Sequence, residues 1–322
     1  MLTNMSLVLE ACQELNIPYE ILHPSQNLIK IKHGGEGYFF VNYMTPFNSA
    51  SIAQILKDKE YTYQLLNGKI NTPKTFSFVS PHCEEKYQKY LSFKDIKSMV
   101  VEIEKNFAFP VILKRNRGSG GNNVFLCASR EQIKAALENI FNVNSKDYDY
   151  VALAQEYIEI EHEYRAVFCK EKLVLLYEKD KSQAEFAGNL SPLHWEGATA
   201  KHIRDLRTPT KETGFLYENT SLQPTDSLKN PVSGPPCVSP NIASRNLMSE
   251  IEAFVKPVFA EITINYGGFD IAVDKNRKYW LIEINSSPNY DIFVRDNDRQ
   301  IVVTMFKGIL ESLVVNKTPY LK

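Results

Sequence analysis

The hydrophobic and polar positions of this 322-residue chain fall into short blocks that predict a mixture of helices and strands. Apolar residues at helical spacing predict helices over residues 6–17, 45–66, 95–106, 131–141, 242–264 and 299–314. Shorter apolar runs predict strands over residues 28–31, 38–41, 109–114, 124–127, 151–158, 163–169, 173–177, 267–273 and 279–288. Pro257 lies inside a predicted helix, so we expect a kink or a break there. Alternation along their strand predicts that Glu163 and Arg165 point outward on one face.

The last two apolar runs predict a β-hairpin with three polar side chains on one face. Glu283 and Asn285 are two residues apart, so in a strand both point to the same side, and Asp270 on the preceding strand can lie opposite them. Oxygen-bearing groups on an otherwise apolar hairpin are costly unless a partner compensates them. Mg²⁺ takes carboxylate and carbonyl oxygens together with phosphates. These residues form a candidate magnesium site, and a solvated sheet face with chance acids is the alternative.

A second chemical feature lies at the end of a predicted strand. Lys114 ends a strand of the buried type and precedes a basic stretch that contains Gly118, Ser119, Gly120 and Gly121. An ammonium group neutralises phosphate charge, and glycines let backbone N–H groups approach phosphate oxygens. The stretch lacks the spacing of a Walker loop and leads into a strand rather than a helix. It is a candidate phosphate loop, with a basic hairpin that binds no ligand as the alternative.

Composition narrows the classes of function without identifying one. The chain is 43% hydrophobic and 23% charged, and its net charge of -1 offers no electrostatic basis for binding nucleic acid or a membrane surface. The sequence contains no apolar run long enough for a membrane span, and its first residues do not resemble a signal peptide. The five cysteines are widely spaced and form no CxxC pair, so neither a disulfide framework nor a zinc site is indicated. We therefore expect a cytoplasmic protein.

Four groups of residues, in this order, resemble the motifs of the ATP-grasp carboxylate–amine ligases. They are Asp58-Lys59 with Leu65-Leu66 and Thr72-Pro73, then Lys114 with Gly118-Ser119-Gly120-Gly121, then Gln155-Glu156-Tyr157-Ile158 with Glu163-Tyr164-Arg165, and last Asp270 with Glu283-Ile284-Asn285. The family includes D-alanine–D-alanine ligase, glutathione synthetase, cyanophycin synthetase and the ligases that add glutamate to ribosomal proteins. The resemblance extends over residues 49–314.

The resemblance implies an α+β chain with the ATP-grasp fold, in which two α+β subdomains clasp ATP. It implies a short N-terminal α/β segment on the substrate side (residues 1–57), a first subdomain with the phosphate loop (58–150), and a second with the metal site (151–322). A long loop excursion at residues 182–240 falls within the second subdomain. The N-terminal segment is shorter than the usual substrate domain of the family, and residues 208–240 have no counterpart there. Both departures leave the substrate open.

The resemblance also implies roles for individual residues. Nucleotide contacts are implied for Lys59, Lys114, Gly118, Ser119, Gly120, Gly121, Gln155, Glu156, Tyr157, Ile158, Glu163, Lys179 and Asn189, with residues 155–158 at the adenine and Glu163 at the ribose. Asp270, Glu283 and Asn285 are implied to hold one or two Mg²⁺ ions, or Mn²⁺, on the phosphates. Arg165, Lys114 and Asn285 are implied to act in catalysis, where Arg165 offsets the charge that builds between two anions.

The implied reaction is an ATP- and Mg²⁺-dependent ligation that forms an amide bond. A substrate carboxylate attacks the γ-phosphate of ATP, and the resulting acyl phosphate reacts with an amine, so that ADP and phosphate are released. The implied partners are small-molecule amino acids or peptides, without nucleic acid or a membrane, and the chain is compatible with a homodimer. Two alternatives stay open: a non-catalytic nucleotide-binding module, and a ligase that modifies a peptide or protein beside the 182–240 excursion.

Overall fold

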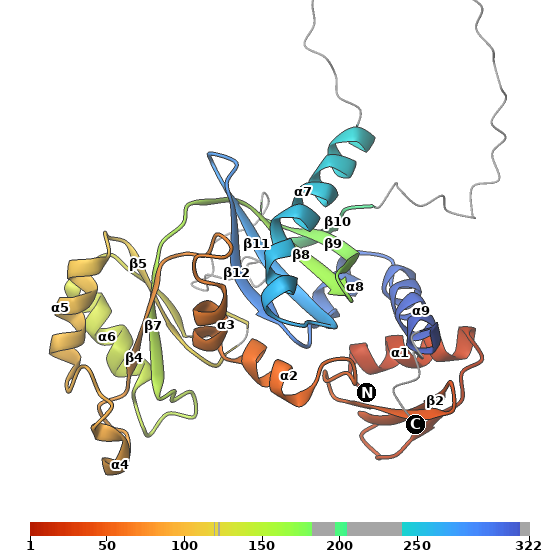
Figure 1. Cartoon of the computed structure of the whole chain (residues 1–322), viewed down its shortest axis with the longest axis horizontal. Helices are drawn as coiled ribbons and strands as arrows, with labels where there is room; N and C mark the ends of the chain where they lie inside the picture. Colours follow the sequence, from red (N-terminus) through yellow and green to blue (C-terminus); the bar gives the residue numbers. More distant parts are fainter. Residues whose placement is uncertain (119, 122, 182–196, 205–239, 316–322) are drawn as a thin grey trace, which may run out of the picture.

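The computed structural model describes residues 1–118, 120, 121, 123–181, 197–204 and 240–315, and these residues form three antiparallel sheets with helices around them (Figure 1). The helices are α1 (Thr3–Glu14), α2 (Ala50–Lys57), α3 (Lys59–Leu66), α4 (Glu85–Gln88), α5 (Ile96–Asn106), α6 (Arg130–Ile140), α7 (Pro240–Glu261), α8 (Asp291–Asp296) and α9 (Gln300–Val315). The strands are β1 (Tyr19–Ile21), β2 (Leu28–His33), β3 (Glu36–Val41), β4 (Thr75–Val79), β5 (Val111–Arg115), β6 (Val124–Cys127), β7 (Val151–Glu156), β8 (Ile160–Cys169), β9 (Lys172–Asp180), β10 (Thr199–His202), β11 (Tyr266–Asp274) and β12 (Tyr279–Asn285). This mixture confirms the predicted α+β class.

The smallest sheet, in the order β1–β2–β3, packs against helices from both ends of the chain. Ile29 and Ile31 alternate along β2 and are buried, as a strand with one covered face requires. Met5 of α1 and Phe306 of α9 lie in the same hydrophobic core as these two isoleucines. The N-terminal residues are therefore packed together with the last helix that the structure describes.

The second sheet, in the order β4–β7–β5–β6, carries α5 and α6 on one face (Figure 1). Both helices begin at capped residues: Asp95 accepts a hydrogen bond from the backbone N–H of Ser98, and Ser129 caps α6 in the same way. Leu113 of β5 and Ala152 of β7 are buried beneath the two helices. This sheet positions the end of β5, where Lys114 lies.

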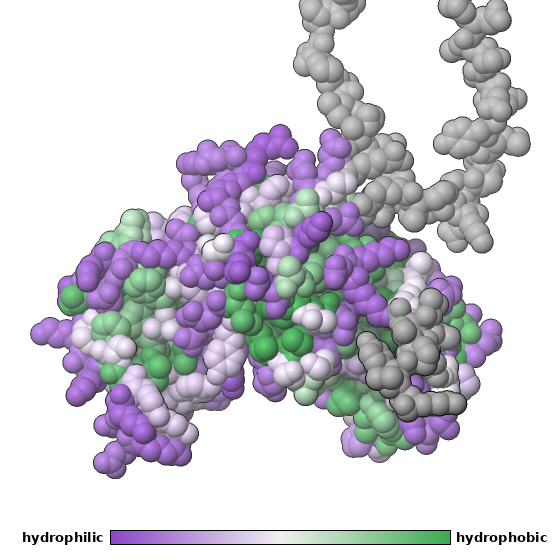
Figure 2. Space-filling view, viewed as in Figure 1, coloured by the Kyte–Doolittle hydropathy of each residue, from purple (hydrophilic) through white to green (hydrophobic). Residues whose placement is uncertain are grey.

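The largest sheet, in the order β10–β9–β8–β11–β12, is covered on both faces. Val255 of α7 packs with Phe269 on one face, while Tyr266 and Tyr177 lie in the core that α1, α8 and α9 share on the other. Residues 266–273 of β11 are all buried for this reason, which explains why the run reads as continuously apolar apart from one acid. Figure 2 shows polar residues over much of the visible surface and an apolar area near α2 and α7.

The segment predicted as one helix over residues 45–66 is two helices. Asp58 has φ -102° and ψ 106°, and it both ends α2 and begins α3. Its side chain accepts a hydrogen bond from the backbone N–H of Tyr61, because aspartate competes with the helix interior and favours the N-cap position. Leu56 and Leu66, one from each helix, pack in the same core as β12 and α7. The break therefore turns α3 without detaching it from the large sheet.

The structure also differs from the sequence predictions at Pro257 and after β9. α7 continues as one helix through Pro257, so the break that was one of the two expected outcomes does not occur. β9 extends to Asp180, and β10 pairs with it at residues 199–202, inside the stretch expected to be a loop. Most of the predicted 182–240 excursion lies outside the described residues.

No helix in the part of the chain that the structure describes is long and apolar enough to cross a membrane. The four cysteines within the described residues, Cys12, Cys83, Cys127 and Cys169, are free thiols.

The buried Asn4 joins α1 to the chain that follows β12. Its side-chain amide donates to the carbonyl of Pro288 at 2.8 Å, and its oxygen accepts from the backbone N–H of Tyr290 at 3.2 Å. Replacing Asn4 with alanine should lower the free energy of unfolding by about 1–3 kcal/mol, because two buried backbone groups lose their partner. Denaturant unfolding measures this loss. Gln13→Ala, at an exposed position of the same helix, is the matched control, and an equal loss in both variants would contradict the account.

Candidate active site

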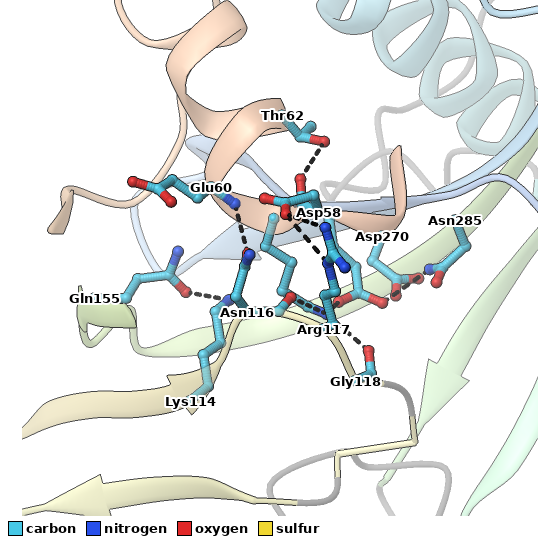
Figure 3. A network of polar contacts seen from close by, with 12 residues as sticks. Asp58, Glu60, Thr62, Lys114, Asn116, Arg117, Gly118, Gln155, Asp270 and Asn285 are labelled. Atoms are coloured by element: carbon cyan, nitrogen blue, oxygen red, sulfur yellow. Dashed lines mark hydrogen bonds and ion pairs between the residues drawn. The ribbon is translucent and has the colours of Figure 1, made fainter. Parts of the chain in front are cut away.

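The predicted hairpin forms between β11 and β12, and its register brings the predicted metal ligands together. Asp270 pairs with Glu283, and Gly268 pairs with Asn285. The side-chain amide of Asn285 donates a hydrogen bond to Glu283 Oε1 at 2.9 Å. Figure 3 shows Asp270 and Asn285 beside each other at the large sheet, across from Lys114 and Gln155.

Asp270 lies at the centre of a buried charge network. Its carboxylate accepts two hydrogen bonds from the guanidinium of Arg165, of which the Nη2–Oδ2 bond is 2.9 Å, and it lies 3.1 Å from Lys179 Nζ. Lys179 also pairs with Glu163. Burial opposes ionisation of Asp270, but the positive charges of Arg165 and Lys179 outweigh it and hold the pKa of Asp270 below its ordinary value. The carboxylate is therefore ionised and compensated at neutral pH.

This network corrects the expectation that Glu163 and Arg165 point outward. They share one face of β8, as alternation predicts, but that face is covered: Glu163 is buried, and 14% of the Arg165 side chain is exposed. Alternation identifies which residues share a face of a strand. It does not identify the solvent side when both faces are covered.

Lys114 lies across from the hairpin, at the end of β5. Its side chain is almost fully buried, and its ammonium donates to Gln155 Oε1 at 2.9 Å, while Gln155 Nε2 donates to Thr75 Oγ1 at 2.9 Å. Burial, and to a smaller extent the positive charge of Lys59, lower the pKa of Lys114 to about 8, against the opposite effect of Glu283. Lys114 is thus a buried cation whose hydrogen-bond partner is neutral.

Lys59, the first residue of α3, connects the glycine-rich stretch to the hairpin. Its ammonium donates to the carbonyl of Gly118 at 2.7 Å and to the carbonyl of Asn116 at 3.4 Å. It also lies 3.6 Å from Glu283 Oε2. Two lysines that are far apart in the sequence, Lys59 and Lys114, therefore lie near the same carboxylate.

The glycine-rich stretch has the backbone that its sequence predicts. Gly120 and Gly121 have φ values of 68° and 69°, in the left-handed region that favours glycine. Gly118 lies in contact with Lys59, as described above. Ser119 and Asn189, two of the predicted nucleotide contacts, lie outside the described residues.

Of the residues predicted to bind adenine, 155–158, only Gln155 contacts one of the two lysines. The side chain of Gln155 faces Lys114, whereas the carboxylate of Glu156 accepts from the backbone N–H of Lys74 at 2.7 Å. β7 ends at Glu156, so Tyr157 and Ile158 belong to the connection to β8, and Tyr157 is exposed. Tyr157 and Ile158 would therefore contact a base from the connection between β7 and β8.

The predicted metal ligands fit a hard cation. Among the described residues, no group of three or more histidine, cysteine, aspartate or glutamate side chains is placed to hold a metal ion. Asp270, Glu283 and Asn285 offer two carboxylates and one amide oxygen, and Asp270 is already paired with two cations. Such a partial set of oxygen donors suits Mg²⁺, which usually keeps several waters and shares its shell with phosphates.

Sequence reasoning missed the polar residues that hold the site together. Asn116 is 1% exposed and accepts a hydrogen bond from the backbone N–H of Glu60 at 2.9 Å. Arg117 Nε and Nη2 each lie 3.3 Å from Asp58 Oδ2, and the backbone N–H of Arg117 donates to Asp149 at 2.7 Å. The sequence signal for Asp58 is that of a helix cap. Asn116 carries no such signal, because asparagine is common in loops.

A cavity of about 520 Å³ lies apart from these residues, between β10 and the chain that follows α8. Lys201, Arg204, Asp296 and Asp298 are among the residues that line it. None of the predicted site residues contributes to its lining.

Two family models match the chain on either side of this cluster. The model described as sugar-transfer associated ATP-grasp matches residues 38–164, and the model described as YheC/D like ATP-grasp matches residues 240–313. The chain belongs to the ATP-grasp family. The first match contains Lys59 and Lys114, and the second contains the hairpin with Glu283. The predicted recognition and the ATP-grasp fold are thereby confirmed.

The chain is also similar to solved structures at low sequence identity. The ATP-grasp ligase PsnB complexed with a minimal precursor is 11% identical, with a TM-score of 0.45 over 84% of this chain and 63% of that one. The D-alanine–D-alanine ligase of Helicobacter pylori is 15% identical, with a TM-score of 0.45 over 79% and 61%. A bifunctional glutathione synthetase from Pasteurella multocida is 16% identical, with a TM-score of 0.49 over 97% and 44%.

Each of these TM-scores is below 0.5, so no single likeness decides the reaction. This ATP-grasp chain also spans less than two thirds of the length of each of the three structures. No curated protein sequence matches it. Family membership supports ATP binding.

The burial of Lys114 predicts a stability effect with a definite pH dependence. Its pKa falls from 10.5 unfolded to about 8 folded, so at pH 7 both states are protonated and the folded state bears the full cost of the buried charge. Stability should rise between pH 8 and 10.5, where the unfolded state binds more protons. Without nucleotide, Lys114→Met should therefore stabilise the protein at pH 7 by up to about 3 kcal/mol, with a smaller gain at pH 10.

Chemical denaturation at pH 7 and pH 10 measures this difference. Lys94→Met, at an exposed position, is the control and should change stability little at either pH. A Lys114→Met protein that is less stable than the wild type at pH 7 would show that the ammonium is stabilised by its surroundings.

Proposed function

We propose that this ATP-grasp protein is an ATP- and Mg²⁺-dependent ligase that joins a carboxylate to an amine through an acyl phosphate. The observation that carries the proposal is the meeting of Lys59, Lys114 and Glu283 where two separately packed sheets face each other. Two cations beside an acid suit a metal–triphosphate complex, since the lysines attract the phosphates and the acid attracts the metal. In a partly buried site these attractions are stronger than in water.

Lys59 and Lys114 neutralise the phosphates. Lys59 keeps its contact with the carbonyl of Gly118 and donates another of its three N–H groups to a phosphate oxygen. Lys114 keeps the neutral amide of Gln155 as its partner, so its charge is available to an anion. A bound phosphate favours the charged ammonium and raises the pKa of Lys114 toward its ordinary value.

Glu283, Asn285 and Asp270 would hold Mg²⁺ beside the phosphates. When bound, the ion supplies positive charge that offsets the negative charge of the attacking carboxylate and of the phosphoryl group. Asp270 is oriented for this role by Arg165 and Lys179, which hold both of its oxygens. Asn285 orients Glu283 through their hydrogen bond.

The reaction proceeds in two steps. A carboxylate oxygen of the substrate bonds to the γ-phosphorus as the bond to the bridging oxygen of ADP breaks. The amine then attacks the acyl carbon and loses a proton, and phosphate leaves. Arg165 offsets charge with the N–H groups that Asp270 leaves available. Closure of the glycine-rich stretch over the phosphates excludes water, because an exposed acyl phosphate hydrolyses.

The nucleoside is bound at the connection between β7 and β8. Gln155 uses its side chain within the protein, so adenine is bound mostly through the backbone of residues 155–158. Glu163 holds the ribose and shares its carboxylate with Lys179, which it contacts in the structure. Lys179 thereby links the ribose contact to Asp270.

The substrate class that we propose is an amino acid or a peptide. The division into residues 1–57, 58–150 and 151–322, a cytoplasmic location and a homodimer belong to the same proposal. A non-catalytic nucleotide-binding module is the alternative function, and the presence of both lysines together with Glu283 and Asn285 supports the enzyme instead.

Replacing Glu283 with glutamine tests the reaction. Magnesium-dependent ADP release by the wild type, with pooled amino acids and peptides, should require both a carboxylate and an amine. Glu283→Gln should reduce this rate at least about 100-fold, because a metal-bound transition state loses a charged ligand. Glu138→Gln, an exposed acid paired with Lys134 on α6, is the control and should keep the wild-type rate.

A coupled ADP assay and mass detection of the product provide the two readouts. Undiminished turnover by Glu283→Gln would contradict the assignment of the metal site. A wild-type protein that binds ATP and Mg²⁺ but releases no ADP with any pair would favour the non-catalytic module.

A further inference from the structure

The N-terminus of α3 joins the two packed cores of the molecule. Leu66 of α3 and Leu56 of the preceding α2 are buried in the core beneath the large sheet. The side chains at the start of α3 also reach the four-stranded sheet, which has its own core, and the loop after β5. We call Asp58, Lys59 and Glu60 the α3 junction, because all three contact residues of that second sheet or of the loop after β5.

Each residue of the α3 junction makes a different contact, with β4 of the four-stranded sheet or with the loop after β5. Asp58 pairs with the side chain of Arg117, Lys59 donates to the carbonyl of Gly118, and Glu60 pairs with Ser77 of β4. The backbone N–H of Glu60 also donates to Asn116 Oδ1. Figure 3 shows Asn116, Arg117 and Gly118 directly beneath the start of the helix.

These contacts use the N–H groups that a helix N-terminus leaves free. The N–H of Tyr61 donates to Asp58, and the N–H of Glu60 donates to Asn116. Such groups otherwise form an anion site, and here two of them are occupied by side chains. Attraction of an anion at this end of α3 therefore falls mainly to the ammonium of Lys59.

We propose that Arg117 and Asn116 are positioning residues that hold the Lys59 ammonium for the nucleotide and thereby set the affinity for ATP. The proposal rests on the proposed function, because it assigns Lys59 to the phosphates.

The position of the ammonium follows from where its partners are held. Lys59 Nζ lies between the carbonyls of Asn116 and Gly118 on one side and the carboxylate of Glu283 on the other. The backbone that carries the two carbonyls is held from both directions, since Arg117 donates its backbone N–H to Asp149 and its side chain to Asp58. Loss of the Arg117 side chain removes one connection toward α3 and keeps both the hydrogen bond of Asn116 with Glu60 and the connection to Asp149. The expected result is a shifted loop in a folded protein.

Arg117→Ala tests this positioning, with Arg130→Ala as the matched control. Both arginines belong to the region of the four-stranded sheet and pair with a carboxylate, and their side chains are similarly exposed, at 40% and 47%. Arg130 pairs with Glu104, away from α3. The readouts are the Kd of a non-hydrolysable ATP analogue with Mg²⁺, measured by calorimetry, and the Tm of each protein.

Arg117→Ala should weaken binding about tenfold with little change in Tm, because small displacements of a charged contact are costly to binding. Arg130→Ala should bind like the wild type. Arg117→Lys should recover part of the affinity, since it restores the charge that faces Asp58. Asp58→Asn keeps a capping oxygen but removes the charge, so the double variant Asp58→Asn/Arg117→Ala should bind no more weakly than Arg117→Ala alone.

Wild-type affinity in Arg117→Ala would overturn the inference while leaving the proposed function intact. A loss of affinity that is equal in Arg130→Ala, or that Arg117→Lys does not reduce at all, would also overturn it. Absence of binding by the wild type would overturn the proposed function and this inference with it. If Arg117→Ala does not fold, Asp58→Asn and Arg117→Lys decide between the same outcomes.

Discussion

Charge buried between two separately packed cores is the constraint on which the site depends. A charged group out of water is costly unless an opposite charge or hydrogen bonds compensate it. At the large sheet, Asp270 is compensated by Arg165 and Lys179. At the four-stranded sheet, Lys114 meets a neutral amide, and its pKa falls to about 8. Positive charge is therefore in excess where the two sheets face each other, and an anion would be stabilised there.

The break at Asp58 makes this arrangement possible. A continuous helix over residues 45–66 would lack the N-terminus that here lies beside the loop after β5. The cap ends α2, starts α3 and leaves Lys59 at the first helical position, near Gly118 and Glu283. Packing of Leu56 and Leu66 keeps both helices on the large sheet. A single aspartate thus caps α3, pairs with Arg117 near the second core, and places Lys59 at the first position of the helix.

Much of the site could be predicted because its chemistry follows strand periodicity. Glu283 and Asn285 share a face by their spacing, whereas the pairing of Asp270 with Glu283 depends on a register shift between Asp270 and Ile271 that the spacing does not reveal. Lys114 and the glycines are adjacent in sequence, and glycine at positive φ needs no tertiary information. The division of the strands into three sheets was harder to predict, because long-range pairing depends on contacts that one sequence does not reveal.

Other features could not be predicted for identifiable reasons. The helical pattern of residues 45–66 is continuous, so the pattern places Asp58 inside a single helix. In the structure Asp58 ends one helix and caps the next. Glu163 and Arg165 were assigned to a solvent face because alternation is the same for either face. Asn116 and Arg117 act through partners that are 56 and 59 residues away in the sequence, and no local pattern reports such contacts. The substrate depends on residues outside the motifs implied to bind the nucleotide and the metal, and those motifs do not specify it.

The central claim is that Lys59, Lys114 and the hairpin form one magnesium–nucleotide site. The most direct test is a crystal structure of the protein with Mg²⁺ and a non-hydrolysable ATP analogue. The account predicts phosphate oxygens in contact with the ammonium groups of Lys59 and Lys114, and a metal ion bound by Glu283 and Asn285. A nucleotide bound elsewhere, or one whose phosphates contact neither lysine, would contradict it.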